Sequence, residues 1–158
     1  MVGYLFSLGK KYGTDKAEMH QYTRHYEEMF KGRRSKVRKV LEIGIWKGGS
    51  LRMWKDFFPK ATIYGIDTCE DYLFKEPRIK CFLCDAGNKE ELKKLPLGKD
   101  FDLIVDDGSH KYNEQMAAFD VLYPLVKEGG IYVIEDVEKE YPMGRMIVEK
   151  QGNLIVID

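Results

Sequence analysis

The sequence lacks features that would place it in several large classes of protein. No apolar run approaches the roughly 18 to 20 residues that span a bilayer, and the first residues lack the order of a secretory signal peptide. The formal net charge is zero, with 26 basic and 26 acidic residues, so no overall charge attracts nucleic acid or a membrane surface. We therefore expect a cytoplasmic protein with no nucleic acid and no membrane as its partner.

Cysteine and nucleotide-binding motifs are scarce as well. The three cysteines, Cys69, Cys81 and Cys84, are an odd number with no second pair to complete a zinc site. Cys81 and Cys84 fall in a predicted strand, where residues three apart point to opposite faces, so we expect no chelating or redox pair. The dinucleotide fingerprint G-x-G-x-x-G and the phosphate loop G-x-x-x-x-G-K-S/T are both absent. A nicotinamide cofactor and a polyphosphate ligand are therefore disfavoured.

What the sequence does contain is a strand, a loop and a helix start in residues 37–50, VRKVLEIGIWKGGS. The apolar run ends in Glu42 and Gly44, and a glycine pair followed by Ser50 leads into an amphipathic segment. Glycine lacks a Cβ, so this loop backbone can come close to a ligand. An acid two residues before the first glycine suits a ligand with a positive charge or an amino group. An ordinary strand-to-helix turn is the alternative interpretation.

The rest of the chain alternates predicted strands and helices. Further strands are predicted at residues 61–67, 79–84, 101–106 and 131–136, and helices at residues 51–58, 89–95 and 116–126. This alternation requires a mostly parallel sheet with helices on both faces, which is a doubly wound, Rossmann-like, three-layer α/β/α fold. Residues 145–149 and 154–157, with a turn at residues 151–153, predict a terminal antiparallel hairpin. Only the short link of residues 137–144 precedes it, so the core is shortened after the fifth strand.

We expect one domain of ordinary size, in which residues 1–36 form a helical lead-in or lid and residues 37–158 form the core. One set of lead-in residues recurs at helical spacing: Met19, Tyr22, Tyr26 and Phe30. It predicts a helix with an aromatic face, preceded by a loop, and such a face is usually part of a core. A second set is unusually polar and aromatic for a connecting segment: Thr14, Asp15, His20 and Tyr22. This set favours a lid over a ligand as the second interpretation.

Acidic residues stand at the end of every predicted parallel strand, where open α/β sheets bind their ligands. They are Glu42, Asp67, Asp85, Asp106, Asp107, Glu135 and Asp136. Carboxylates crowded at one edge repel one another, so we expect a positive group among them. Asp67 lies 23 residues after Gly44, the spacing at which an acid accepts hydrogen bonds from ribose hydroxyls. A helix cap is the alternative role for Asp67.

Three of these acids form a candidate metal site. If the fourth and fifth strands are neighbours, about 4.8 Å apart, then Asp107, Glu135 and Asp136 converge on one point. Three hard oxygen ligands suit Mg²⁺, which keeps water or substrate oxygens in its other positions. His110 is within reach of the same point, and a neutral imidazole there can remove a proton from a substrate hydroxyl. Alternatively, the segment DDGSH is only a polar strand-to-helix cap.

With these motifs in hand, the chain resembles the class I S-adenosylmethionine-dependent methyltransferases, and among them the macrocin-type sugar O-methyltransferases. The matching segments occur in the family's order: YGTDK, the pair His20 and Tyr22, LEIGIWKGGSLRMW, YGID, DDGSH and GGIYVIED. The resemblance implies S-adenosyl-L-methionine as cofactor together with a divalent metal, most simply Mg²⁺. It also implies His110 as the catalytic base and Asp107, Glu135 and Asp136 as the metal ligands.

The same resemblance assigns the cofactor-binding residues, which are Thr14, Glu42, Gly44, Ser50, Asp67, Asp85 and Asp106. Glu42, Gly44 and Ser50 lie around the methionine part of the cofactor, with Thr14 nearby. Asp67 takes the ribose hydroxyls and Asp85 lies by the adenine.

Methyl transfer from S-adenosylmethionine to a hydroxyl of a small molecule, a sugar or vicinal diol, is therefore the leading hypothesis. The acceptor is then the partner of this chain, and a homo-oligomer is left open. A non-catalytic S-adenosylmethionine-binding module, or a subunit that depends on a partner, is the alternative. A nicotinamide oxidoreductase is the least favoured hypothesis.

Overall fold

The computed structural model describes residues 3–138, 140–149 and 152–158, and its centre is a seven-stranded sheet in the order β3-β2-β1-β4-β5-β7-β6. The parallel strands are β1 (Lys39–Ile43), β2 (Thr62–Asp67), β3 (Ile79–Leu83), β4 (Phe101–Asp106) and β5 (Val126–Glu135). The antiparallel strands are β7 (Gly152–Ile157), which pairs with β5, and β6 (Arg145–Glu149), which pairs with β7. The predicted parallel sheet with a terminal antiparallel hairpin is confirmed.

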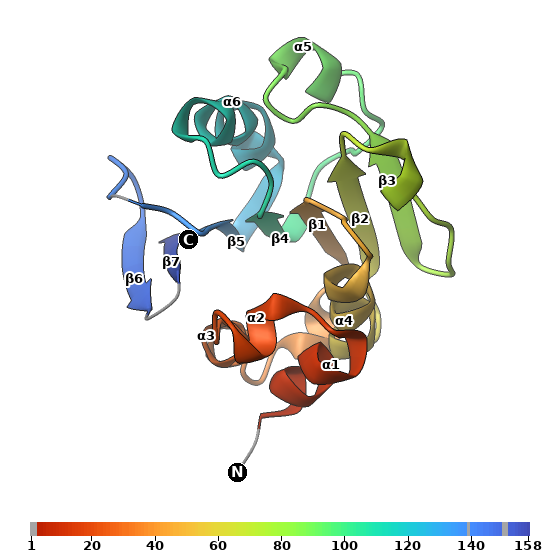
Figure 1. Cartoon of the computed structure of the whole chain (residues 1–158), viewed down its shortest axis with the longest axis vertical. Coiled ribbons are helices and arrows are strands. Elements are labelled where there is room, and N and C mark those ends of the chain that lie inside the picture. Colours follow the sequence, from red (N-terminus) through yellow and green to blue (C-terminus); the bar gives the residue numbers. More distant parts are fainter. Residues whose placement is uncertain (1–2, 139, 150–151) are drawn as a thin grey trace.

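Helices lie on both sides of this sheet (Figure 1). One side carries α1 (Tyr4–Tyr12), α2 (Asp15–Glu18), α3 (Thr23–Met29) and α4 (Gly49–Phe57). The other carries α5 (Lys89–Leu92) and α6 (Tyr112–Leu122). Short 3₁₀ helices are η1 (Arg34–Lys36), η2 (Glu70–Tyr72) and η3 (Tyr123–Leu125). The three-layer prediction is confirmed, and none of the helices in the described ranges combines the length and apolarity of a membrane crossing.

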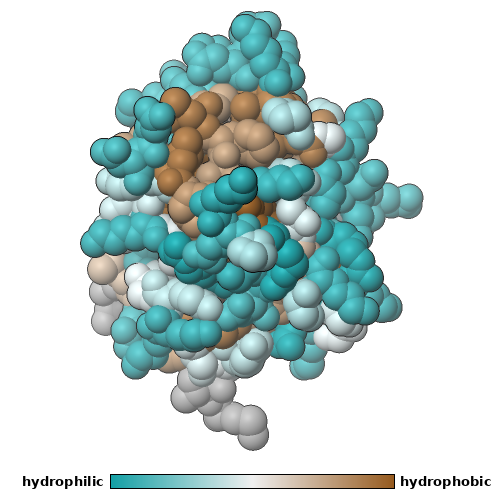
Figure 2. Space-filling view, turned by 90° about the vertical axis from the view of Figure 1, so that its right-hand side faces the viewer, coloured by the Kyte–Doolittle hydropathy of each residue, from teal (hydrophilic) through white to brown (hydrophobic). Residues whose placement is uncertain are grey.

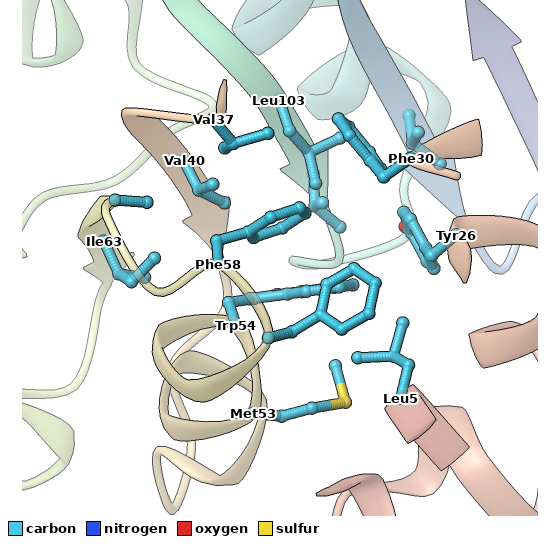
Figure 3. Packing of buried hydrophobic residues seen from close by; sticks show 14 of the residues in the cluster. Leu5, Tyr26, Phe30, Val37, Val40, Met53, Trp54, Phe58, Ile63 and Leu103 are labelled. Carbon is cyan, nitrogen blue, oxygen red and sulfur yellow. The ribbon is translucent and has the colours of Figure 1, made fainter. Parts of the chain in front are cut away.

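Two apolar cores, one on each face of the sheet, follow from the alternation of side chains along the strands. Val40 and Leu103 belong to the core beneath α1, α3 and α4, whereas Leu41 and Ile104 belong to the core beneath α5 and α6. In Figure 3, Trp54 and Phe58 fill the centre of the first core, between the sheet and the residues Leu5 and Tyr26 of the N-terminal helices. The N-terminal helices therefore share a core with the sheet, and the boundary at residue 36 stays a prediction.

The lead-in segment differs from the single aromatic helix that the periodicity predicts. A helix that the periodicity did not predict, α1, comes first, and it ends at Gly13, whose φ of 67° is left-handed. The expected helix is then divided into α2 and α3, with Gln21 between them at a φ of 61°. Met19 is 56% exposed and does not join the core. The prediction of one continuous helix was wrong because the tertiary contacts of the intervening residues override the local periodicity.

The helix predicted at residues 116–126 also ends early. Helix α6 stops at Leu122, and β5 begins at Val126 and runs through the glycine pair that was expected to end the helix. Pro124 has no N–H to donate and so forbids continuation of the α-helix, and the chain passes through η3 instead. Gly129 takes a φ of 70°, close to the shift in the pairing register between β4 and β5.

The two edges of the sheet are formed by β3 and β6. Leu83 of β3 is 52% exposed, and apolar side chains gather on the side of the molecule that includes this edge (Figure 2). The described residues between β5 and β6 contain no helix, as the short link predicts. Of the predicted turn at residues 151–153, Gly152 and Asn153 belong to β7, and Gln151 lies outside the described residues.

Candidate functional site

The acids at the strand ends are sorted onto opposite faces by the same alternation that sorts the cores. Glu42 follows Val40, Asp107 follows Val105, and Glu135 follows Val133, each two residues later and therefore on the face that carries α1 to α4. Asp106 follows Ile104 and faces the side of α6. One row of strand-end acids thus points toward the lead-in segment.

A buried lysine from the lead-in segment meets this row. Lys16 Nζ lies 2.5 Å from Asp107 Oδ2, 2.5 Å from Glu135 Oε2 and 3.1 Å from Glu42 Oε1. The side chains of Lys16 and Glu135 are 1% exposed and that of Glu42 is fully buried. The positive group that the crowded carboxylates require therefore includes an ammonium of the chain itself, which sequence reasoning missed.

The charges of this cluster shift the pKa values of its members. Burial by itself lowers the pKa of Lys16, but the attraction of three carboxylates outweighs it, so this pKa lies well above its usual range. Burial raises the pKa values of Glu42 and Glu135, with repulsion from Asp107 acting in the same direction and attraction to Lys16 opposing it. One ammonium thus faces three carboxyl groups, and burial favours the protonated form of two of them, Glu42 and Glu135.

Two tyrosines of the lead-in segment hold the acids of β5. Tyr26 donates its hydroxyl to Glu135 Oε1 at 2.5 Å, and Tyr22 donates its hydroxyl to Asp136 Oδ1 at 2.5 Å. Burial raises the pKa of both hydroxyls, so they remain protonated donors. His20 stacks on Tyr22 with ring centroids 5.2 Å apart, and its Nδ1 lies 3.4 Å from Asp136 Oδ1.

Asp107, His110 and Asp136 form a group of candidate metal ligands. One ligand atom from each lies within 4.8 Å of the others. His110 Nε2 is 3.9 Å from both Asp107 Oδ1 and Asp136 Oδ2, and the three side chains are partly exposed. The structure thus brings Asp107, His110 and Asp136 together, while the carboxylate of Glu135 faces Lys16 and Tyr26 instead.

Two residues of this group have left-handed backbone conformations. His110 and Asp136 take φ values of 60° and 53°, in the left-handed region that residues with a Cβ seldom adopt. Such conformations persist only where surrounding contacts impose them, and they cluster at ligand sites.

The glycine loop forms the opposite wall. Ser50 donates its hydroxyl to Glu42 Oε2 at 2.6 Å, which links the first turn of α4 to the buried acid. Asp67 Oδ2 accepts the backbone N–H groups of Ile45 at 2.8 Å and Trp46 at 3.2 Å. Asp67 therefore stabilises the backbone of the glycine loop and does not cap α4, which begins at Gly49 without a side-chain cap.

Two cavities of about 210 and 460 Å³ lie along the carboxyl ends of the strands and share Gly44, Asp67 and Gly108. The smaller cavity is also lined by Asp85, Asp106 and Gln115. The larger is also lined by Thr14, Ser50, Asp107, His110 and Asp136. Six of the seven predicted cofactor residues therefore line a cavity, and Glu42 lies buried behind Ser50.

Asp106 is the buried acid of the smaller cavity. It is 2% exposed, its Oδ1 accepts the N–H of Gly108 at 3.4 Å, and its Oδ2 has no hydrogen-bond partner among the described residues. Burial raises the pKa of Asp106 to about 7. Asp85 at the far end of the cavity is exposed, and its Oδ1 accepts the N–H of Gly87 at 2.8 Å.

Comparison with known families decides what kind of domain carries this site. A family described as a methyltransferase domain matches residues 41–137, which run from within β1 through β5 and include all seven strand-end acids. The chain belongs to this methyltransferase domain family.

Named relatives of the methyltransferase domain are O-methyltransferases. The chain is 39% identical over 146 residues to mycinamicin VI 2''-O-methyltransferase from Micromonospora griseorubida. The aligned residues cover 87% of this chain and 37% of that protein. Demethylmacrocin O-methyltransferase from Streptomyces fradiae shows the same identity and the same coverage. The chain thus spans less than two fifths of the length of these relatives.

Solved structures of similar proteins have the same fold. The MycE methyltransferase of the mycinamycin pathway, in complex with Mg, SAH and mycinamycin VI, matches with a TM-score of 0.79 at 40% identity, covering 85% of this chain and 39% of that one. A second crystal form, with Mg and SAH, matches with a TM-score of 0.82 at 28% identity, covering 98% and 53%. The class I methyltransferase fold of the chain is thereby shown.

The groups that sequence reasoning missed or underused lie outside residues 41–137. Lys16 and Tyr26 were not proposed as site residues. Tyr22 was noted for the aromatic helix face, for a lid and for the family resemblance, but was given no role in the site. The signal for Lys16 was the excess of acids at one sheet edge, which a buried ammonium reduces as well as a metal does. The lead-in segment of this methyltransferase domain also lines the larger cavity through Thr14, and the lid interpretation stays a prediction.

Proposed function

We propose that this methyltransferase domain transfers a methyl group from S-adenosylmethionine to a hydroxyl of a small molecule, a sugar or another vicinal diol. The observation that carries the proposal is the larger cavity, where the glycine loop faces His110 and two partly exposed carboxylates. Relatives and structural neighbours with the corresponding activity, and with Mg and SAH bound, support it.

The two cavities suit the two ends of the cofactor. We place the adenosine part in the smaller cavity between Asp67 and Asp85, and the methionine part in the larger cavity beside Gly44, Ser50 and Thr14. The acids around the loop suit the positively charged amino and sulfonium groups of the cofactor. Asp67, which lines both cavities, is the residue proposed for the ribose hydroxyls.

The donor set of the larger cavity fits a divalent ion. Carboxylate oxygens are the ligands that Mg²⁺ prefers, so we assign the ion to Asp107 and Asp136. Glu135 remains a predicted third ligand, although its oxygens are held by Lys16 and Tyr26. When bound, such an ion lowers the pKa of a hydroxyl that it contacts.

His110 is the proposed general base. An imidazole nitrogen is a poorer ligand for Mg²⁺ than an oxygen, so His110 stays free to act beside the carboxylates. Its Nε2 faces the same space as Asp107 Oδ1 and Asp136 Oδ2. There it accepts the acceptor's hydroxyl proton while the acceptor oxygen forms a bond to the methyl carbon and the bond from sulfur to methyl breaks.

The decisive experiment is a titration of the chain with S-adenosylmethionine, with and without Mg²⁺, followed by a methyl-transfer screen on sugars and catechols. We expect cofactor binding together with metal-dependent transfer to a hydroxyl. Tight cofactor binding without metal dependence or product would favour a non-catalytic binding module, and binding of NAD instead would overturn the assignment. A homo-oligomer, the cytoplasmic location and the absence of nucleic-acid and membrane partners stay predictions.

A further inference from the structure

Tyr22 reaches the candidate metal group from outside the matched family domain. It belongs to the short break between α2 and α3, is fully buried, and donates its hydroxyl to Asp136 Oδ1 at 2.5 Å. The other carboxylate oxygen of Asp136, Oδ2, faces His110 Nε2 at 3.9 Å. One oxygen of the carboxylate is thus held by the lead-in segment while the other faces the candidate ligands.

The surroundings leave the Tyr22 hydroxyl and the Asp136 carboxylate little freedom. His20 stacks on the Tyr22 ring with an interplanar angle of 18°. Gly152 of β7 packs so closely that an added Cβ would overlap the Tyr22 hydroxyl and lie 2.6 Å from Asp136 Oδ1. Asp136 itself has a φ of 53°, a conformation that needs such restraint.

A hydrogen bond to one oxygen of a ligating carboxylate determines which oxygen is presented to the ion. Partners of this kind are a general feature of metal sites, and their removal weakens metal binding. Tyr22 is suited to the task because its ring is rigid and its hydroxyl has a single heavy-atom position relative to the ring.

We propose that Tyr22 is a positioning residue of the metal centre, whose hydroxyl holds Asp136 so that Oδ2 is presented to the divalent ion. The inference rests on the proposed function, because it takes Asp136 to be a metal ligand. It assigns the break in the lead-in helix a function: residues 19–22 leave the helical path so that Tyr22 reaches the end of β5.

The test consists of two titrations of the full chain. Binding of Mn²⁺ is measured by electron paramagnetic resonance, and binding of Mg²⁺ by calorimetry. We expect Tyr22→Phe to weaken metal binding by about 10- to 100-fold, the effect typical of lost partners of metal ligands. Binding of S-adenosylhomocysteine measured without metal should be unchanged, and circular dichroism should show a folded chain. Tyr132→Phe is the matched control, because Tyr132 is also fully buried, lines neither cavity and has an unpartnered hydroxyl among the described residues.

A double variant separates positioning from a general loss of stability. If Tyr22 acts through Asp136, then Tyr22→Phe should cause no further loss of metal affinity in an Asp136→Asn background. Equal metal affinity of wild type and Tyr22→Phe, or additive losses in the double variant, would overturn the inference while leaving the proposed function intact. A wild-type chain that binds neither ion overturns the metal centre and this inference together.

Discussion

The ammonium of Lys16 and the carboxylate of Glu135 lie 2.5 Å apart, although 119 positions separate them in the sequence. Lys16 comes from a four-residue helix of the lead-in segment, and Glu135 from the last position of strand β5. Since the same ammonium also contacts Glu42 and Asp107, one side chain joins the end of β1, just before the glycine loop, to the candidate metal ligands.

Replacement of Lys16 by methionine should destabilise the chain by about 3–5 kcal/mol, because it leaves buried carboxylates without their partner. Urea unfolding without divalent ions measures the change. Lys10→Met is the control, since the ion pair of Lys10 with Glu18 is largely exposed and should contribute little. Added Mg²⁺ should restore part of the stability of Lys16→Met. A variant as stable as wild type would show that the ammonium is not needed to hold the acids.

Gly44→Ala should disturb the contact between the glycine loop and the loop after β4. Gly44 has a φ of 94°, and a Cβ there would overlap the carbonyl oxygen of Asp107. The variant should lose more stability than the roughly 1–2 kcal/mol that a left-handed alanine costs by itself. Gly13→Ala measures that cost alone, because Gly13 has a φ of 67° and a Cβ there meets nothing within 4 Å. Equal losses in the two variants would refute the close approach.

His110→Ala should lower methyl transfer by about 10²- to 10⁴-fold, the range for loss of a general base. Binding of S-adenosylmethionine should be retained, because His110 lines the larger cavity on the side of the acids, away from the adenosine end. Steady-state turnover and a cofactor titration on the same preparation give both values. Parallel loss of binding and turnover would argue against the assigned role.

Asp106→Asn should change the pH dependence of stability. Burial raises the pKa of Asp106 to about 7. The hydrogen bond from the Gly108 N–H opposes this shift, and repulsion from Asp107 and Glu114 adds to it. The pKa of Asp106 is thus higher in the folded chain than its unfolded value near 3.8. The contribution of protonated Asp106 to the stability is therefore fully present below pH 3.8 and is lost as the pH rises through about 7. Asparagine loses no proton. Between these two pKa values, the free energy of unfolding of the variant should therefore rise relative to that of wild type by up to about 1.4 kcal/mol per pH unit.

Unfolding free energies at pH 5 and pH 8, without metal or cofactor, test this prediction. Tyr132 and Tyr141 also sense the charge of Asp106, but burial raises the pKa of both hydroxyls, so they stay neutral in this range. A stability difference that does not vary with pH would mean that Asp106 ionises normally.

Much of the fold could be predicted because its signals are local. Apolar runs that end in acids identify β1 to β5, and the glycine loop identifies the start of α4. The end of α6 could also have been predicted from the sequence, since Pro124 lies inside the predicted helix and forbids its continuation. No local signal predicts the break at Gln21, because the break depends on the tertiary contact between Tyr22 and Asp136.

For the site, the sequence by itself determined which acids stand at the strand ends, and the alternation of side chains along the strands assigns Glu42, Asp107 and Glu135 to one face. Only the tertiary structure decided what meets them there. Lys16 contacts Asp107 and Glu135, Tyr26 contacts Glu135, and Tyr22 contacts the neighbouring Asp136. Each of these pairs is more than 90 positions apart in the chain, and no periodicity encodes such a distance. Charge balance requires a cation beside buried carboxylates, but only the packing of α2 and α3 on the sheet shows that the chain supplies one of its own.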